Sequence, residues 1–407
     1  MGSTFAIILS ASVFVLIGYY LNVPLPENIS ERWKLKIILA GYKLAHLMTQ
    51  VGTSAGFDSS LNITRITFGT MFAWTSQPVS PDGLEIFDSA IENVPVRVYR
   101  PKDFKEMERL LPVLLYYHGG GMITFSLDTY EQVLRQMAKE LQAVIVSVGY
   151  RLAPEHKFPA AIDDCFTVTD HVLKHASVYG GDETRVAIAG DSAGGNLAAA
   201  VSWRLAYNAP MTGGIPVLPK FQVLLYPMLQ AFDFQISSYV TQSNELAPSG
   251  AIAGAWYMYC TGKLTPPVSD LLVNNHTSHE QKKSKYAKFV DSSLVQHPKY
   301  KTNTENPPSS LYNKELASEV EHCIKDPSFA PLMAENLSKF PMTYILSAEF
   351  DILRDESFMF EARLKSAGVN VTYEHLFGAW HGVVSYTRTS TGRDALQRVI
   401  RFIRERL

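Results

Sequence analysis

The sequence predicts an α/β fold in which a mostly parallel, doubly wound sheet is covered by helices on both faces. Beyond residue 90, short continuous apolar runs of strand length recur along the chain, and such runs are typical of strands buried on both faces. Helical stretches separate these runs, so strand and helix alternate. The chain has 407 residues, of which 46% are hydrophobic and 19% charged. It is therefore long and apolar enough to bury a large core.

The predicted elements follow one another in a regular order. The first strand, at 94–99 (VPVRVY), alternates apolar and polar residues as a half-buried strand does. The later strands are continuous apolar runs, at 112–117, 143–148, 185–189, 221–226 and 343–347. Helices are predicted between and after them, at 129–141, 160–175, 193–205, 356–367 and 393–407.

Two regions interrupt this alternation. Residues 27–90 are expected to form helices and loops, an N-terminal cap region ahead of the main domain at 91–407. Residues 267–325 are polar and rich in Lys, Ser, Asn and Pro, which is typical of a solvated insertion. We expect the first region and part of about 230–330 to cover a pocket. Their apolar residues would then face a lipophilic ligand or simply pack in the core, among them Phe72, Trp74 and the run Ala255–Tyr259.

The N-terminal segment 1–26 is expected to be a membrane anchor. No charged side chain occurs from Gly2 to Pro26, and residues 5–21 (FAIILSASVFVLIGYYL) are nearly all apolar. A spanning helix needs ~20 such residues. The paired tyrosines at its end suit a membrane interface. No clean A-x-A cleavage site follows, which favours an uncleaved anchor over a cleaved signal peptide or a buried core helix.

Two signals for membrane orientation disagree. No Lys or Arg precedes the apolar segment, while Arg32, Lys34 and Lys36 follow it, so the positive-inside rule does not favour a lumenal body. Five Asn-x-Ser/Thr sequons point the other way, because glycans are added on the lumenal side. The sequons at Asn28 and Asn370 are weak candidates, since one lies near the membrane and the other opens an alternating apolar run. The remaining glycosylation candidates are Asn62, Asn275 and Asn336.

Composition excludes several classes of partner. Lys and Arg number 37 and Asp and Glu 39, with no basic block, which argues against nucleic-acid binding. No Cys/His ligand cluster is visible, so neither a metal nor a cofactor is predicted. Three cysteines are too few for a disulfide framework. Cys165 lies in a helical stretch and is interpreted as a buried thiol. Cys260 and Cys323 could pair, but their spacing does not decide it.

The most informative motif is Gly190-Asp191-Ser192-Ala193-Gly194, which fits G-x-S-x-G. An apolar strand precedes it and an Ala-rich helix follows. This context predicts a sharp strand-to-helix turn that lifts the serine hydroxyl above the sheet, with glycines that allow close backbone passage. A serine becomes a good nucleophile when a neighbouring base takes its proton. The motif therefore predicts a catalytic Ser192; an ordinary glycine-rich turn is the alternative.

A second glycine motif, His118-Gly119-Gly120-Gly121, lies at the end of the strand predicted at 112–117. Its position before the serine motif and at the end of an early strand suits an oxyanion hole. The backbone N–H groups of Gly119, Gly120 and Gly121, with that of Ala193, would face the negative oxygen of a tetrahedral intermediate. A plain turn or a phosphate loop is the alternative, but no G-K-[ST] follows.

The orienting acid is expected after the serine, near the end of the strand predicted at 343–347. Residues 349–356 (EFDILRDE) offer four carboxylates there, at the strand end where ligands gather in such sheets. The next helix is expected to begin near Asp355, so Asp355 and Glu356 suit capping or the helix dipole. Asp351, in the loop just past the strand, is the better acid.

The base is expected after the acid, following the chain order Ser, Asp or Glu, His. His381 lies in a glycine-flanked loop (GAWHG) that follows a predicted strand (VTYEHLF). His375 lies within that strand and is expected to point elsewhere. Ser192, Asp351 and His381 are thus the predicted catalytic triad.

These motifs together resemble the hormone-sensitive-lipase branch of the α/β-hydrolases, and most of all its arylacetamide deacetylase-like members. The resemblance covers nearly the whole chain. It is carried by HGGG at 118–121, YRLAPE at 150–155, FPA at 158–160, GDSAGGNLAAA at 190–200, DILRDE at 351–356 and HG at 381–382, and by the N-terminal segment with PLPEN at 24–28. It implies an α/β-hydrolase fold with a helical cap, and it assigns the triad acid to Asp351.

The resemblance implies a serine carboxylesterase or deacetylase that hydrolyses small lipophilic esters or arylacetamides through an acyl-enzyme. It further implies an endoplasmic-reticulum membrane protein, single-pass type II, with a lumenal catalytic domain; secretion after signal-peptide cleavage is the alternative. Two other functions remain open: a lipase for neutral lipid or sterol esters, and a catalytically silent, membrane-anchored binding protein. A silent protein usually lacks a triad member, and none is missing here.

Overall fold

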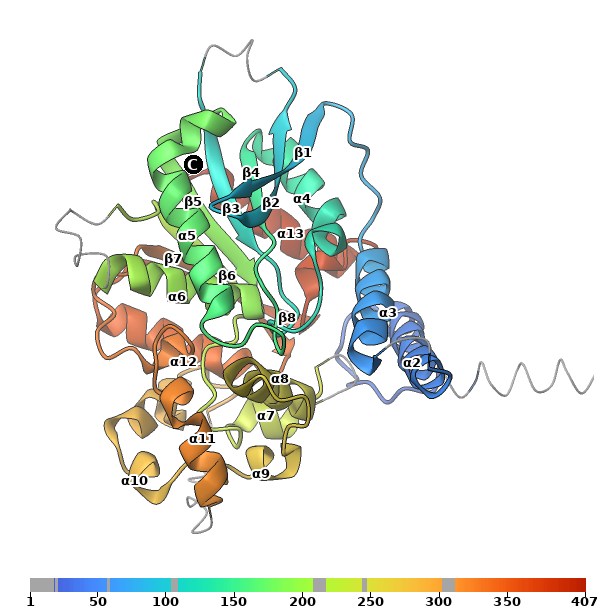
Figure 1. Ribbon diagram of the computed structural model, residues 1–407, viewed down its shortest axis with the longest axis vertical. Helices are drawn as coiled ribbons and strands as arrows, with labels where there is room; N and C mark the ends of the chain where they lie inside the picture. The colour runs from blue at the N-terminus through green and yellow to red at the C-terminus, as the bar shows by residue number, and fades with distance from the viewer. Residues whose placement is uncertain are drawn as a thin grey trace, which may run out of the picture.

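The computed structural model describes residues 18, 21–56, 59–103, 109–207, 217–243, 247–301 and 312–407. Within these residues the strands form one eight-stranded sheet in the order β1-β2-β4-β3-β5-β6-β7-β8 (Figure 1). β2 pairs antiparallel with β1 and β4, and the pairs from β4 to β8 are parallel. The strands are β1 Leu84–Ile91, β2 Val94–Pro101, β3 Leu111–Tyr117, β4 Val144–Val148, β5 Gly181–Asp191, β6 Phe221–Leu225, β7 Met342–Phe350 and β8 Val371–Trp380.

Helices cover both faces of the sheet. Along β3, Val113, Leu115 and Tyr117 join one buried cluster, whereas Leu114 and Tyr116 join another, because successive side chains of a strand point to opposite faces. The first cluster includes α5 (Ala160–His175), α6 (Ala193–Tyr207) and α12 (Arg354–Ser366), and the second includes α4 (Leu127–Leu141) and α13 (Ser390–Arg404). The predicted α/β fold and its mostly parallel sheet are confirmed.

One strand lies where the sequence predicted only cap. β1 occupies Leu84–Ile91, so the sheet begins inside the expected cap region 27–90. Its pattern is weakly apolar because β1 is an edge strand with polar residues exposed. A two-residue turn at Glu92 and Asn93, both with positive φ (49° and 68°), connects it to β2. Such a hairpin turn favours Asn or Gly, and a single Asn was too weak a signal to reveal it.

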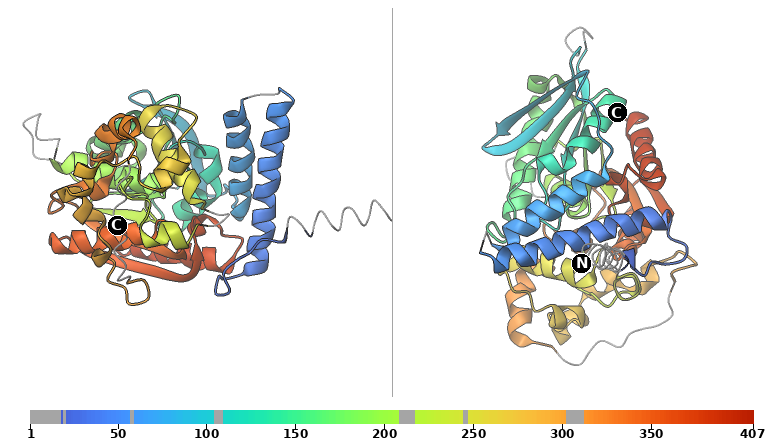
Figure 2. Two further views of the ribbon diagram at one scale, coloured as in Figure 1. Left: turned by 90° about the horizontal axis from the view of Figure 1, so that it is seen from below. Right: turned by 90° about the vertical axis from the view of Figure 1, so that its right-hand side faces the viewer.

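Two groups of helices lie beside the sheet and form the cap. α2 (Arg32–Ser54) and α3 (Ser60–Thr75) pack side by side, and α3 also contacts α4 (Figure 2). The second group gathers at the lower end of the body in Figure 1. It comprises α7 (Ser237–Thr241), α8 (Ser249–Thr261), α9 (Val268–Leu272), α10 (His279–Lys282) and α11 (Lys314–Ile324), with the short 3-10 turns η3 (Lys285–Val290) and η4 (Ser292–Leu294).

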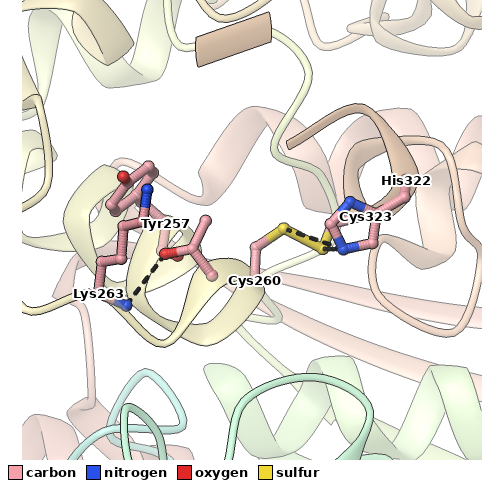
Figure 3. The surroundings of a disulfide bond; sticks show 6 residues. Tyr257, Cys260, Lys263, His322 and Cys323 are labelled. Atoms are coloured by element: carbon pink, nitrogen blue, oxygen red, sulfur yellow. Dashed lines mark hydrogen bonds between the residues drawn. A yellow bond between two sulfur atoms is a disulfide. The ribbon is translucent and has the colours of Figure 1, made fainter. Parts of the chain in front are cut away.

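The polar region 267–325 is not simply a solvated insertion. Its helix α11 buries Leu316, Val320 and Ile324 in the core, because these residues recur at helical spacing on one face. A disulfide joins Cys260 at the end of α8 to Cys323 in α11, with a Cα–Cα distance of 6.0 Å (Figure 3). Cys165 is a buried free thiol, as predicted. The covalent link and the apolar face fix this polar stretch to the body.

The predicted anchor segment 1–26 lies mostly outside the described residues. Of the apolar run at 5–21, the structure describes residues 18 and 21. No helix in the described ranges is both long and apolar enough to cross a membrane. The chain that follows is packed against the body, since Val23, Leu25 and Ile29 are all buried.

Candidate active site

Ser192 lies at the sharp turn between β5 and α6. It has a positive φ of 55°, a strained conformation that its surroundings hold in place. Its backbone N–H donates to the carbonyl of Leu225 at 2.8 Å, and its carbonyl accepts from Met228 at 3.1 Å. A Cβ at Gly194 would lie 1.9 Å from the Tyr117 carbonyl oxygen. The helix therefore packs directly on the strand backbone, which a side chain at this position would prevent.

Ser192, His381 and Asp351 form a continuous hydrogen-bonded chain. The distance from His381 Nε2 to Ser192 Oγ is 3.0 Å, and that from His381 Nδ1 to Asp351 Oδ2 is 2.9 Å. The residues come from the ends of β5, β8 and β7, which lie together at the carboxyl edge of the sheet. The structure thus brings together the three side chains that the sequence singled out, in the arrangement that activates a serine.

Charge and burial have opposite effects on the pKa of His381. Burial by itself lowers the pKa of the imidazole, but the charge and hydrogen bond of Asp351, with the charge of Asp191, raise it above its ordinary value. Asp351 is fully buried, and its other oxygen accepts a 2.9 Å bond from the Leu353 N–H. Since one carboxylate oxygen is fixed by backbone, the other points at the imidazole and holds its tautomer.

His375 faces away from this chain. Its Nδ1 lies 2.8 Å from Ser347 Oγ and its Nε2 lies 3.0 Å from Tyr300 Oη. Burial lowers its pKa to about 4. The expectation that His375 points elsewhere is confirmed.

The four backbone N–H groups expected to form the oxyanion hole are not equivalent. The Gly119 N–H donates to Tyr130 Oη at 3.0 Å and to Asp191 Oδ1 at 3.1 Å. It is therefore unavailable to a substrate, which corrects the prediction for this residue. Gly120 and Gly121 line the cavity beside Ser192, and their N–H groups and that of Ala193 have no acceptor among the described residues. Three of the four candidates thus remain.

Asp191 is the member of the site that sequence reasoning missed. Its carboxylate is buried and accepts hydrogen bonds from Tyr116 (3.0 Å), Tyr130 (2.8 Å) and Gly119 (3.1 Å). Burial raises the pKa of Asp191 to about 6, although these hydrogen bonds partly offset the rise. Its signal was a carboxylate directly before the nucleophile, in a position that the motif leaves free. It joins the glycine loop after β3 to the serine turn.

His118 supports the same loop from the other side. Its ring stacks on Tyr150 with centroids 4.3 Å apart, and Tyr150 Oη donates to the His118 carbonyl at 2.6 Å. Burial lowers the pKa of His118 to about 4, so the ring is neutral at physiological pH. It acts as a structural member of the loop.

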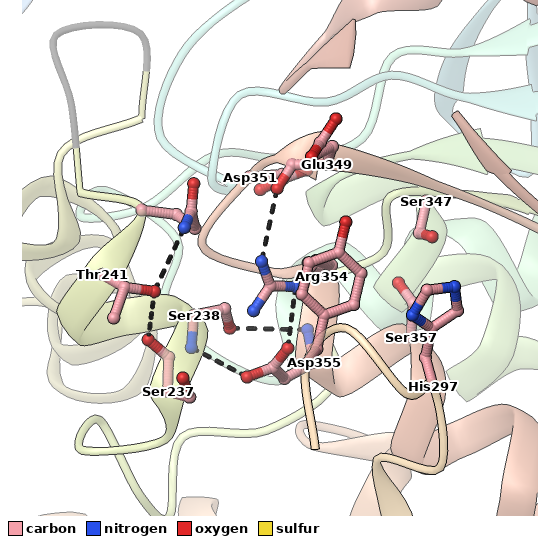
Figure 4. Close-up of polar contacts among 12 residues, drawn as sticks. Ser237, Ser238, Thr241, His297, Ser347, Glu349, Asp351, Arg354, Asp355 and Ser357 are labelled. Carbon is pink, nitrogen blue, oxygen red and sulfur yellow. Dashed lines mark hydrogen bonds and ion pairs between the residues drawn. The ribbon is translucent and has the colours of Figure 1, made fainter. Parts of the chain in front are cut away.

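The remaining carboxylates near Asp351 bind other segments instead of capping α12. Asp355 accepts from Arg354 at 2.9 Å and from the backbone N–H of Ser238 at 2.8 Å (Figure 4). Glu356 accepts from Tyr239 Oη at 2.8 Å and from backbone N–H groups at 229 and 230. Asp355 thereby fixes α7, and Glu356 fixes α7 and the loop before it. Neither side chain caps α12, but both lie in its first turn, the position expected for acids that complement the helix dipole.

A cavity of about 990 Å³ opens over Ser192 and His381. Its wall is mainly apolar and comes from both cap groups and the glycine loop. Phe72 and Ala255 line it, as expected, whereas Trp74 is 46% exposed and lies against Arg388. Three further residues of the run Ala255–Tyr259 pack in the core instead of lining the cavity, namely Trp256, Tyr257 and Tyr259. The other apolar lining residues include Leu39, Leu47, Leu61, Phe68, Ala251, Ile252 and Met258. Such a volume is at the upper end of the ~300–1,000 Å³ typical of ligand pockets.

Comparisons with known proteins agree with this architecture. A protein-family model described as "alpha/beta hydrolase fold" matches residues 114–290 and 267–385. Neutral cholesterol ester hydrolase 1 of Mus musculus is 34% identical over 395 residues, covering 94% of each chain. Arylacetamide deacetylase of Oryctolagus cuniculus is 33% identical over 406 residues, covering 97% of each. The ester hydrolase EH1AB1 from the metagenome of Lake Arreo superposes with a TM-score of 0.63 at 26% identity, over 90% of this chain and 97% of that one.

The fold and the serine turn thus define an α/β-hydrolase. The chain belongs to the hormone-sensitive-lipase-type family of these enzymes, as an arylacetamide deacetylase-like member. It is an esterase or deacetylase, and the resemblance inferred from its motifs is confirmed.

Proposed function

We propose that Ser192, His381 and Asp351 are the catalytic triad of this hydrolase. The observation that carries the proposal is the chain of hydrogen bonds from Ser192 Oγ through His381 to Asp351, 3.0 and 2.9 Å long. His381 Nε2 takes the serine proton as Oγ attacks the carbonyl carbon of the ester or amide. The N–H groups of Gly120, Gly121 and Ala193 stabilise the oxyanion.

The first half of the reaction ends with loss of the leaving group. His381 gives its proton to the leaving alcohol or amine, and the acyl group stays on Ser192. In the second half of the reaction a water attacks the acyl carbon while His381 takes its proton; the bond from the acyl carbon to Ser192 Oγ then breaks, Oγ regains a proton from His381, and the acid is released. Asp351 keeps the imidazole in the required tautomer and stabilises its positive charge in both halves.

Active-site labelling of the full chain tests the triad directly. A fluorophosphonate should label the wild type and leave Ser192→Ala unlabelled, and hydrolysis of a p-nitrophenyl ester should be lost in the same variant. The matched control is Ser347→Ala, which removes a buried hydroxyl bonded to His375 outside the site. Equal labelling of wild type and Ser192→Ala would refute the assignment.

The substrates we propose are bulky lipophilic esters and arylacetamides. The cavity is large and mostly apolar, and relatives named neutral cholesterol ester hydrolase and arylacetamide deacetylase match over most of the chain. The cavity volume favours a neutral lipid or sterol ester as a second candidate. A p-nitrophenyl ester series from acetate to palmitate separates the two: a maximum at short chains supports the esterase, and a maximum at long chains supports the lipase.

We further propose that the N-terminal segment 1–26 anchors the enzyme in the endoplasmic-reticulum membrane with its body in the lumen. The Cys260–Cys323 disulfide supports an oxidising compartment. The candidate Asn62 is exposed, and so is Asn336. Asn275 is a weaker acceptor, since its amide donates to Asp270 at 2.9 Å and its sequon threonine, Thr277, is buried.

Glycosidase treatment of microsomes tests this topology. A mobility shift that disappears in Asn62→Gln and Asn336→Gln supports a lumenal body, and alkaline carbonate extraction distinguishes an anchored from a secreted protein. A body without any glycan and open to protease on the cytoplasmic side would refute the proposal.

A further inference from the structure

Helix α2 carries an exposed apolar face that the body leaves uncovered. Trp33 is 65% exposed, Met48 55% and Val51 58%; the other exposed members are Ile37, Leu44 and Leu47. At 3.6 residues per turn these six positions fall within roughly 100° of one another around the helix. They therefore form one continuous stripe, which we name the α2 stripe. A contiguous exposed apolar surface of this kind marks an interaction site.

The charges of α2 select the partner. The helix contains Arg32, Lys34, Lys36 and Lys43 and no Asp or Glu. On a helical projection these cations flank the α2 stripe on both sides. An apolar stripe with Trp and Leu, bordered by basic residues, is the pattern of a helix that lies in a membrane interface.

The anchor proposed for residues 1–26 would bring a bilayer close to this helix. The apolar run at 5–21 ends 11 residues before α2 begins. The linker between them is fixed to the body, since the Ser30 N–H donates to the Gly378 carbonyl at 2.9 Å, and to the start of α2, since Arg32 donates to the Leu25 carbonyl at 3.0 Å. Figure 2 shows α2 at the outer edge of the molecule, with α3 between it and the body.

The cavity opens beside this stripe. Leu47 belongs to the α2 stripe and also lines the cavity. Its neighbours His46 and Gln50 on α2 line the cavity too, although they are not part of the stripe. The rim of the cavity is therefore continuous with the exposed apolar face.

We propose that the α2 stripe docks on the lipid bilayer, so that lipophilic substrates enter the cavity directly from the membrane. The docking part is argued from the α2 stripe and its flanking cations together with the proposed anchor at 1–26, and the entry route rests on the proposed hydrolase function. At the interface, the stripe would lie ~5–10 Å deep, at the boundary of headgroups and acyl chains.

Fluorescence quenching tests the docking part. The full chain is reconstituted into phosphatidylcholine vesicles that contain brominated phosphatidylcholine, with and without phosphatidylserine. The test uses a Trp74→Phe background, because Trp74 on α3 is itself 46% exposed. In that background Trp33 should be quenched, and the quenching should disappear when Trp33→Phe is added, since Trp203, Trp256 and Trp380 are at least half-buried in the body. Equal quenching with and without Trp33→Phe in the Trp74→Phe background would overturn the proposal.

Charge insertion tests the entry route. Leu44→Glu with Met48→Glu alters the stripe but not the cavity wall. Hydrolysis of a long-chain ester embedded in vesicles should fall roughly tenfold, whereas hydrolysis of water-soluble p-nitrophenyl acetate should not change. The matched control is Val178→Glu, which adds a charge at a 70% exposed apolar residue outside α2.

The outcomes separate the possible failures. Unchanged hydrolysis of the embedded ester in the double variant would overturn the entry route. A dimer that the double variant dissociates, with Trp33 unquenched, would assign the stripe to a second copy of the chain and overturn the proposal. If only the proposed function is wrong, Ser192→Ala will still hydrolyse p-nitrophenyl acetate, whether or not Trp33 is quenched.

Discussion

The carboxylate of Asp191 accepts the backbone N–H of Gly119 at 3.1 Å and thereby couples the serine turn to the glycine loop. The hydroxyl of Tyr130 completes the contact, since it lies 3.0 Å from the same N–H and 2.8 Å from Asp191 Oδ2. The proposed oxyanion donors that follow Gly119 are therefore positioned by the residue adjacent to the proposed nucleophile. Asp191 touches no reacting atom in the proposed mechanism, so it is a positioning residue.

Asp191→Asn is expected to lower kcat about 10–100-fold with little change in KM. The amide replaces one acceptor oxygen by a donor, which meets the N–H of Gly119 or the hydroxyl of Tyr130 and displaces the loop. A lost oxyanion donor costs ~2.7–4 kcal/mol in other enzymes, and a displaced loop weakens its donors in part. Steady-state kinetics with a short p-nitrophenyl ester measure both constants. A change confined to KM would contradict the positioning role.

Asp351→Asn is expected to lower kcat/KM by roughly 10³–10⁴-fold and to move its pH profile. The catalytic form of His381 is neutral, so activity falls as the pH drops through the pKa of the imidazole. In the wild type Asp351 raises that pKa, and its loss should shift the acid limb to lower pH. Profiles of kcat/KM between about pH 5 and 9 test this. An acid limb at the same pH in both proteins would contradict the assignment of Asp351.

Glu356→Gln is expected to make the protein less sensitive to rising pH. Burial raises the pKa of Glu356 to about 8, despite hydrogen bonds to its carboxylate. The folded state therefore keeps a proton that the unfolded chain releases near pH 4.5, and the free energy of unfolding declines between these two values by ~1.4 kcal/mol per unit of pKa difference. Urea unfolding at about pH 5 and pH 8 should show a decline that is smaller in the variant. The same decline in both proteins would refute the prediction.

Cys260→Ser with Cys323→Ser is expected to lower the free energy of unfolding by about 2–4 kcal/mol, because the disulfide spans 63 residues. It should also raise KM more than it lowers kcat, since α8 lines the cavity through Ala251, Ala255 and Met258 but holds no member of the triad. Reductant should destabilise the wild type and leave the double variant unaffected, which is the control. Equal free energies of unfolding for the wild type and the double variant, both measured without reductant, would contradict this prediction.

The sequence singled out the three side chains that the structure joins by hydrogen bonds, because its signals for them are local. A strand, a glycine turn and a helix specify Ser192, and the chain order after it leaves few choices for Asp351 and His381. The role of Asp191 depends on Tyr116 and Tyr130, which come from β3 and α4. Such convergence of distant elements leaves no mark in a short pattern.

In the rest of the fold, too, elements with a local sequence signal were predicted, and elements that depend on distant contacts were missed. Continuous apolar runs revealed the buried strands, whereas β1 was missed because an edge strand needs few apolar residues. α11 was hidden because its apolar face is diluted by polar residues on its other faces. The pairing of Cys260 with Cys323 depends on the packing of α8 against α11, which no spacing encodes.

The disulfide also has a consequence for a chain cut by a protease. Any single cut between Cys260 and Cys323 leaves both fragments joined by the sulfur–sulfur bond. Ser192 then stays in the first fragment while Asp351 and His381 stay in the second. A nicked enzyme would run as one species on a gel without reductant and as two with it, and the three residues of the proposed triad would be held together across two polypeptides.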